Sequence, residues 1–181
     1  MNYARIFLSD IANGPGARVS LFVSGCTHHC KGCFNAPLWQ FDYGELFTGE
    51  TEEYILGCLA TEGNDGLTIL GGEPMEIVNQ AGIISLVRRA KGMGKSVWIY
   101  SGYTLEELKD PWDSRCHGPY TDEILGLIDV LVDGEFHENE KDISLAYRGS
   151  RNQRIIYLEN GKPIKVISGV EFDKEWRGEW K

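Results

Sequence analysis

Three cysteines, Cys26, Cys30 and Cys33, lie within eight residues of this 181-residue chain, directly after the apolar run 19–23. Their spacings match neither one face of a strand nor one face of a helix. The three thiols can therefore meet only if the backbone wraps around a common centre as a loop. Thiolates that meet in this way are ligands for a soft metal. Tetrahedral zinc and a 4Fe–4S cluster each take four ligands, so one metal position is left open for another molecule.

The bulk composition excludes several classes of protein. A formal net charge of −9 argues against nucleic acid as a partner, because phosphates require a basic surface. No apolar run approaches the roughly 18 residues of a membrane span, and the N-terminus lacks the long apolar region of a signal peptide. Five cysteines, three of them clustered, are a poor framework for secreted disulfides. We therefore expect a cytoplasmic protein with reduced thiols and no membrane or nucleic-acid partner.

The segments that must position the cysteines alternate between strand and helix patterns. Apolar runs typical of buried strands lie at 19–23, 67–70, 96–100 and 129–132. Helical patterns cover about 52–60, 79–93 and 121–128. Such repetition predicts an α/β fold with a parallel sheet and right-handed crossovers.

Residues suited to binding follow the ends of these strands. In chain order they are the cysteine loop, Gly71-Gly72-Glu73, Ser101-Gly102 and Asp133-Gly134. The carboxyl ends of parallel strands meet at one edge of the sheet, where sites form. The sequence therefore predicts that these four segments share one rim.

The other segments carry weaker signals. Residues 110–120 are expected to form a surface loop, and residues 135–154 are highly charged and irregular. Asn160-Gly161 indicates a β-hairpin between strands at 155–158 and 164–167.

Isolated cysteines and histidines have alternative interpretations. His28 and His29 could be zinc ligands, but adjacent imidazoles point apart, so we expect solvated loop residues. Cys58 lies on an apolar helical face and is interpreted as core filler. Cys116 and His117 could supply a distant fourth ligand, although their loop shows no periodicity that favours this.

The cysteine motif C-x-x-x-C-x-x-C resembles the signature of the radical S-adenosylmethionine (SAM) superfamily. Within it, the chain is similar to the family that activates anaerobic ribonucleotide reductase. The segments that carry this similarity are 13–18, 21–26, 33–35, 101–103, 129–134 and 148–154. The resemblance covers residues 1–157 and implies a partial (βα) barrel of the radical SAM type. Residues 158–181 are then a C-terminal extension made of the β-hairpin and a tail.

The resemblance implies two cofactors. The three clustered cysteines would hold three irons of a 4Fe–4S cluster, and the methionine moiety of SAM would chelate the fourth iron. Gly71 and Gly72 would let the backbone approach the amino group of SAM, which Glu73 could orient. No acid–base pair is required, so no catalytic side chain is assigned.

Four further residues are expected to contact SAM: Gly32, Phe34, Ser101 and Asp133. Gly32 stands where many members of the superfamily place an aromatic residue, and Phe34 lies on the other side of the last cysteine. Asp133 is expected to bond the ribose hydroxyls. The arginines at 148, 151 and 154 are left open between a solvated face and contacts with the SAM carboxylate or a partner.

The implied activity is that of a glycyl-radical activating enzyme. The reduced cluster would cleave SAM to methionine and a 5′-deoxyadenosyl radical, which would install a glycyl radical on an anaerobic ribonucleoside-triphosphate reductase. A one-electron donor such as flavodoxin would reduce the cluster. The alternatives are a radical SAM enzyme acting on another glycyl-radical enzyme or a small molecule, and a non-enzymatic zinc-binding module.

Overall fold

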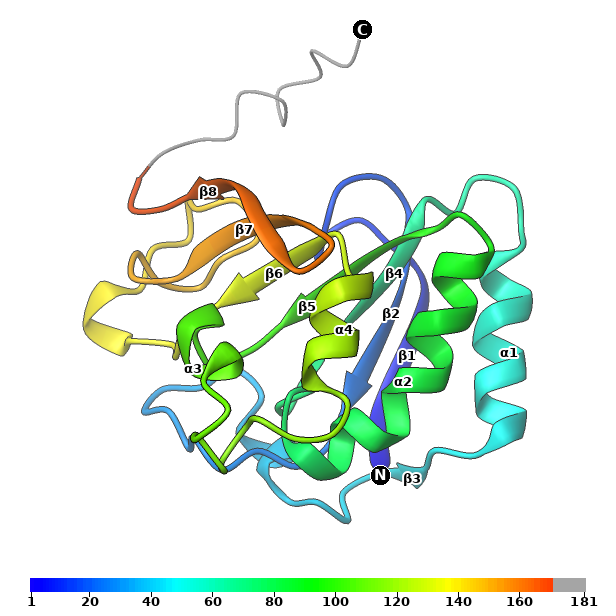
Figure 1. Cartoon of the computed structure of the whole chain (residues 1–181), viewed down its shortest axis with the longest axis horizontal. Helices are drawn as coiled ribbons and strands as arrows, with labels where there is room; N and C mark the ends of the chain where they lie inside the picture. Colours follow the sequence, from blue (N-terminus) through cyan, green and yellow to red (C-terminus); the bar gives the residue numbers. More distant parts are fainter. Residues whose placement is uncertain (171–181) are drawn as a thin grey trace, which may run out of the picture.

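The four expected parallel strands form the centre of one mixed sheet (Figure 1). The computed structural model describes residues 1–170, and the strand order is β3-β1-β2-β4-β5-β6-β7-β8. The strands are β1 (Asn2–Asp10), β2 (Arg18–Val23), β3 (Glu45–Leu46), β4 (Gly66–Gly71), β5 (Ser96–Tyr100), β6 (Val130–Asp133), β7 (Arg154–Glu159) and β8 (Lys162–Ile167). Strands β2, β4, β5 and β6 run parallel, and the other four pair antiparallel with their neighbours. The predicted α/β class is confirmed.

Within the described residues, four α-helices pack on one face of this sheet. They are α1 (Gly49–Leu59), α2 (Ile77–Gly92), α3 (Leu105–Lys109) and α4 (Thr121–Leu127), and two 3₁₀ turns are η1 (Ala36–Trp39) and η2 (Glu138–Glu140). Helix α1 begins three residues before its expected start, because Thr48 and Thr51 form a reciprocal capping box. In α2 the buried apolar positions recur at helical spacing, at Ile83, Leu86, Val87 and Ala90.

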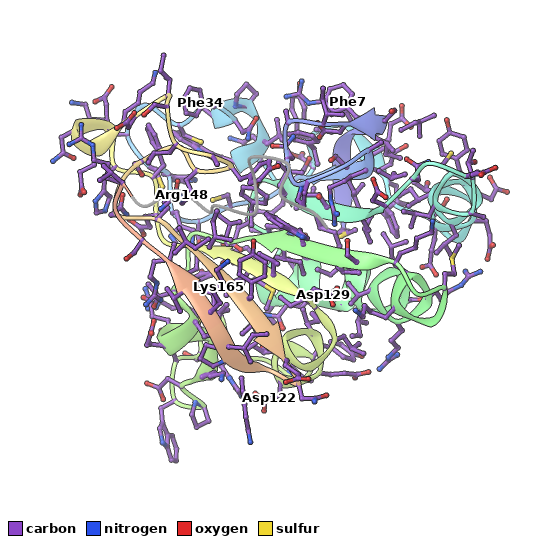
Figure 2. The ribbon with its side chains drawn as sticks, turned by 90° about the horizontal axis from the view of Figure 1, so that it is seen from above. Phe7, Phe34, Asp122, Asp129, Arg148 and Lys165 are labelled. Carbon is purple, nitrogen blue, oxygen red and sulfur yellow. The ribbon has the colours of Figure 1, made fainter. Side chains whose placement is uncertain are left out.

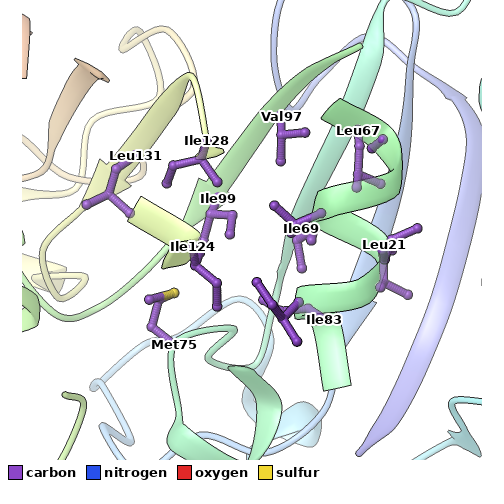
Figure 3. Close-up of a cluster of buried hydrophobic side chains, with 14 of the residues drawn as sticks. Leu21, Leu67, Ile69, Met75, Ile83, Val97, Ile99, Ile124, Ile128 and Leu131 are labelled. Atoms are coloured by element: carbon purple, nitrogen blue, oxygen red, sulfur yellow. The ribbon is translucent and has the colours of Figure 1, made fainter. Parts of the chain in front are cut away.

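The main core lies between the helices and the sheet (Figure 3). Leu21, Leu67 and Ile99 point from the strands into this layer, where they meet Ile83 of α2 and Ile124 of α4. All five side chains are fully buried. Because strand side chains alternate between faces, the intervening residues of the same strands must point to the other side of the sheet.

That other side carries two smaller apolar clusters, one around Phe22 and Leu70 and one around Trp98. Among residues 1–170, loops and the 3₁₀ turn η1 cover this side, and Leu38 of η1 joins the cluster around Phe22. Figure 2 shows Phe34 and Arg148 of these loops on the side of the molecule away from Asp122, which belongs to α4. A site at the carboxyl edge of the strands therefore has the helical layer behind it and loops in front.

Strand β1 was not predicted from the sequence. Residues 1–16 were expected to be a simple lead-in, but Asn2–Asp10 pairs antiparallel with β2. Most of its side chains are partly or largely exposed. A strand with such open faces lacks the apolar alternation by which strands are recognised.

The predicted hairpin is present, with Asn160 and Gly161 at positive φ values of 50° and 72°. Both angles fit the two-residue turn that joins twisted strands. Strand β7 also pairs with β6 and buries Ile155 and Ile156. The expected boundary between residues 157 and 158 therefore falls inside a strand of the main sheet.

The loop at 110–120 only partly fits the prediction of a surface loop. Trp112 is 90% exposed, but Cys116 is completely buried in the main core. Within residues 1–170, no helix combines the length and apolar character needed to cross a membrane.

Candidate functional site

A cavity of about 450 Å³ opens at the carboxyl edge of the parallel strands. Eight of the residues expected at the site line it: Cys26, Cys30, Cys33, Phe34, Gly71, Gly72, Glu73 and Ser101. The structure therefore brings together the loops after β2, β4 and β5 as predicted. The segment after β6 also reaches the cavity, but through Gly134, whereas Asp133 and Gly32 lie outside the wall.

The cysteine loop is held by its own backbone. The amide of Gly25 donates to the carbonyl of Leu38 at 2.8 Å, and the amide of Cys26 donates to Trp39 at 3.1 Å. His29 has a positive φ of 51°, which is the left-handed conformation needed for the chain to turn back on itself. The segment around η1 thus forms the base on which the three thiols are arranged.

The thiols differ in their burial, and two of them are biased toward the protonated form. Cys26 is 8% exposed, while Cys30 and Cys33 are partly exposed. Burial raises the pKa of Cys26 to about 12, with the charge of Glu73 acting in the same direction, and burial also raises the pKa of Cys30. Among residues 1–170, no three Cys, His, Asp or Glu side chains are close enough to share a single metal ion.

The turn after β4 packs backbone to backbone against the cysteine loop. Gly71 has a φ of +110°, and the amide of Glu73 donates to the carbonyl of Gly25 at 2.8 Å. A Cβ atom at Gly71 would lie 2.8 Å from the carbonyl oxygen of Val23. The glycines of this turn therefore allow the strand ends and the cysteine loop to approach each other closely.

The carboxylate of Glu73 is almost completely buried and joins the turn after β4 to the turn after β5. Oε1 accepts hydrogen bonds from the amide of Met75 at 2.7 Å and from Ser101 Oγ at 2.9 Å, and Oε2 accepts one from the amide of Gly102 at 2.6 Å. The family resemblance implied that Glu73 could orient the amino group of SAM. In the structure both of its oxygens already bind donors of the protein, so the carboxylate fixes the turn after β4 to the turn after β5.

The expectation that His28 is a solvated loop residue is wrong. Its side chain is only 7% exposed, and it lies 3.3 Å from Glu73 and 2.7 Å from Glu135. Burial lowers the pKa of His28, but its contacts with the two carboxylates outweigh burial and raise the pKa to about 9. The ring also packs against Tyr103, with 4.2 Å between centroids. Its partners lie far away in sequence, and no local pattern could have identified them.

Asp133, which was expected to bond the ribose hydroxyls of SAM, lies inside the protein. It is the last residue of β6 and is completely buried, and its carboxylate accepts hydrogen bonds from the amide of Leu105 at 2.8 Å and from Arg154 Nε at 2.9 Å. It thus anchors the start of α3 and does not reach the cavity. Gly32 also lies outside the wall, and a Cβ atom built there would lie 2.8 Å from the carboxylate of Glu138.

The three arginines left open by the sequence have separate roles. Arg154 pairs with Asp133 and Glu106, and the exposed Arg151 pairs with Asp142 at 3.2 Å. Arg148 lines the cavity and is largely buried.

Asn79 is a positioning residue that the sequence did not reveal. It lies in the first turn of α2 and is 1% exposed. Its Nδ2 donates to the carbonyl of Glu73 at 2.8 Å and to that of Ser24 at 3.0 Å. One amide therefore links the turn after β4 to the residues that lead into the cysteine loop.

The comparisons with known proteins agree with this geometry. A family model described as a 4Fe-4S single cluster domain matches residues 12–156. This range includes the cysteine loop, the turn after β4 and all four parallel strands. The fold and the three thiols around one cavity thus define a protein of the single-cluster 4Fe–4S class.

Curated relatives identify the family more closely. A protein of Pasteurella multocida is 44% identical over 161 residues, which cover 87% of this chain and 97% of the relative. One of Vibrio cholerae is 41% identical over 159 residues, with coverage of 86% and 97%. One of Enterobacteria phage T4 is 38% identical over 157 residues, with coverage of 86% and 93%. All three bear the name "anaerobic ribonucleoside-triphosphate reductase-activating protein". The chain belongs to this family.

Proposed function

We propose that this protein activates an anaerobic ribonucleoside-triphosphate reductase by installing a glycyl radical on it, using a 4Fe–4S cluster and SAM. The observation that carries the proposal is the convergence of Cys26, Cys30 and Cys33 on one cavity with the turn at Gly71 and Gly72. Membership of the family named for this activity supports it. On this proposal, the open mixed sheet is a partial barrel of the radical SAM type.

The residues around the cavity fit the cluster and SAM. Within residues 1–170, three thiols and no fourth cysteine line the wall, which is a suitable donor set for a cluster with one open iron. Burial opposes ionisation of Cys26 and Cys30, so a positively charged metal centre would stabilise the thiolates and release protons on binding. The cavity of about 450 Å³ also falls within the size range of cofactor pockets.

Each group in the wall would have a defined task. Cys26, Cys30 and Cys33 would hold the cluster, and Phe34 and Ser101 would contact SAM. Glu73 and Asn79 would keep the turn after β4 against the cysteine loop, so that both cofactors meet at a fixed place. When bound, the reduced cluster supplies the one electron that cleaves SAM into methionine and a 5′-deoxyadenosyl radical.

The open side of the cavity would admit the reductase. A loop carrying glycine has no side chain to block its approach, and the flanking amides stabilise a radical on Cα. Transfer of one hydrogen atom from that glycine would break its Cα–H bond and form a C–H bond on the 5′ carbon that SAM supplies. A cytoplasmic one-electron donor such as flavodoxin would supply the electron for each cycle.

Electron paramagnetic resonance tests the proposal directly. The protein, reconstituted without air, is mixed with SAM, a one-electron reductant and the reductase. A doublet from a glycyl radical is expected, and it should be absent when the target glycine of the reductase is changed to alanine. Efficient SAM cleavage without any radical on the reductase would contradict the proposal and favour a small-molecule substrate.

A further inference from the structure

A second, smaller cavity adjoins the candidate site. It has a volume of about 220 Å³ and shares Phe34 and Asn35 with the wall of the larger cavity. Phe34 is 64% exposed and stands at the boundary between the two. Figure 2 shows Phe34 on the same side of the molecule as Phe7 of the neighbouring strand β1. A molecule that enters the larger cavity from this side therefore passes the smaller one.

The wall of the smaller cavity combines an arginine with exposed aromatic side chains. Arg5 lies in β1, and its guanidinium stacks over Phe22, 4.9 Å from the ring centroid, and lies 5.8 Å from that of Phe7. Tyr43, on the segment between η1 and β3, is 44% exposed. Arginine and exposed aromatic residues are enriched at protein interfaces and often dominate their binding energy.

Arg5 has no carboxylate partner among residues 1–170, although the chain carries a net charge of −9. Arg151 and Arg154, by contrast, are paired with carboxylates, Arg151 with Asp142 and Arg154 with Asp133 and Glu106. The guanidinium of Arg5 is held in place by two aromatic rings and retains donors suited to a planar carboxylate. The smaller cavity thus offers a preorganised positive group beside apolar walls.

We infer that this second cavity binds a segment of the reductase that adjoins the radical glycine, with an acidic side chain of that segment paired to Arg5 and apolar contacts to Phe34 and Tyr43. The inference rests on the proposed function, because it takes the reductase as the partner. A flexible glycine loop alone offers few contacts. A neighbouring anchor would supply the affinity and hold the glycine over the larger cavity.

The experiment compares Arg5→Glu with Lys162→Glu, a matched charge reversal on β8 at the opposite edge of the sheet. Binding of the intact reductase to the cluster-loaded protein is measured directly, without reductant. Arg5→Glu should weaken binding about tenfold or more, as expected for a charge in an interface, while Lys162→Glu should not. Arg5→Lys retains the positive charge but loses the planar, forked donors of the guanidinium. Its affinity for the reductase should therefore lie between those of wild type and Arg5→Glu. The effect of added salt on binding should be smaller in Arg5→Glu than in wild type.

Three results would overturn the inference. The first is equal binding of the reductase to wild type and Arg5→Glu. The second is failure of Tyr43→Ala to weaken binding at all. The third is tighter binding of the reductase both after removal of residues 171–181 and in Arg5→Glu. That result would mean that the C-terminal end of this chain occupies the cavity. If the reductase binds as expected but no glycyl radical forms on it, the proposed function is contradicted, while the docking surface is still supported.

Discussion

A Cβ atom at Gly72 would lie 2.6 Å from the carbonyl oxygen of Gly25 and 3.0 Å from that of Leu38. Both atoms belong to backbone that positions the cysteine loop, and neither can move as a flexible side chain could. Gly72 is therefore required for contact between two loops of the protein, whatever its role toward SAM.

Gly72→Ala should weaken cluster binding and SAM binding together. We expect the added methyl group to lower the free energy of unfolding by about 1–3 kcal/mol, as overpacking does, and to reduce iron content together with SAM binding. Gly57→Ala is the control, since a Cβ atom in this part of α1 meets nothing within 4 Å among the described residues; it should stabilise the protein slightly. Iron content equal to wild type in Gly72→Ala would show that the two loops are not coupled.

Asn79→Ala should weaken SAM binding through the turn that it holds. The substitution leaves the buried carbonyls of Ser24 and Glu73 without their donor, at a cost of about 1–3 kcal/mol. Gln80→Ala is the matched control, because Gln80 is equally buried but donates to Met75 and Cys116. Denaturant unfolding should show similar losses for both variants, whereas equilibrium binding should show reduced SAM affinity only for Asn79→Ala.

Replacing any one of Cys26, Cys30 and Cys33 by alanine should abolish stable cluster binding. Each would supply one of only three protein ligands, and no other cysteine of residues 1–170 lines the cavity. Cys58→Ala should retain the cluster, since Cys58 packs against the core. Iron analysis and visible absorbance after reconstitution without air would measure this, and an intact cluster in Cys30→Ala would refute the ligand assignment.

The C-terminal hairpin should contribute to the stability of the whole fold. Ile167 of β8 is 4% exposed and packs with Trp98 and Ile155, so Ile167→Ala should cost about 2–5 kcal/mol. Ile164 on the same strand is 66% exposed, and Ile164→Ala should change little. A single cooperative transition in both variants would indicate that the residues after 157 fold with the sheet. An early separate transition in Ile167→Ala would support an independent extension.

Cys116 should resist alkylation in the folded protein. Burial raises the pKa of its thiol to about 12, with Asp113 and Glu107 acting in the same direction. Because the folded state favours the neutral thiol, the thiolate that attacks iodoacetamide is scarce at a pH of about 8. The contribution of the neutral Cys116 thiol to the stability of the fold is fully present below a pH of about 9, where the unfolded thiol is also neutral. This contribution is lost as the pH rises toward 12. Peptide mapping should find Cys116 labelled only after unfolding, and rapid labelling of native protein would contradict its burial.

The local signals of this sequence determined the α/β class and the loops that bring the cysteines, the glycine turn and Ser101 to one cavity. Apolar runs identified β2, β4, β5 and β6, and the ends of parallel strands necessarily meet at one edge. Hence the strand pattern by itself was enough to place Cys26, Gly71 and Ser101 together, because they follow three of these strands. Asn160-Gly161 likewise specified its hairpin, because few other residues adopt the two positive φ values.

Tertiary structure alone decided which polar groups face the cavity and which hold the loops. Asp133 and Glu73 both follow the pattern of a polar residue at a strand end, yet the carboxylate of Asp133 is taken up by Leu105 and Arg154. His28 is buried because Glu73 and Glu135 approach it from distant loops. Such partners lie from 21 to 107 residues away, and their pairing depends on how the loops pack. The local sequence carries no record of that packing, since hydrophobic periodicity reports burial within an element and not the contacts between elements.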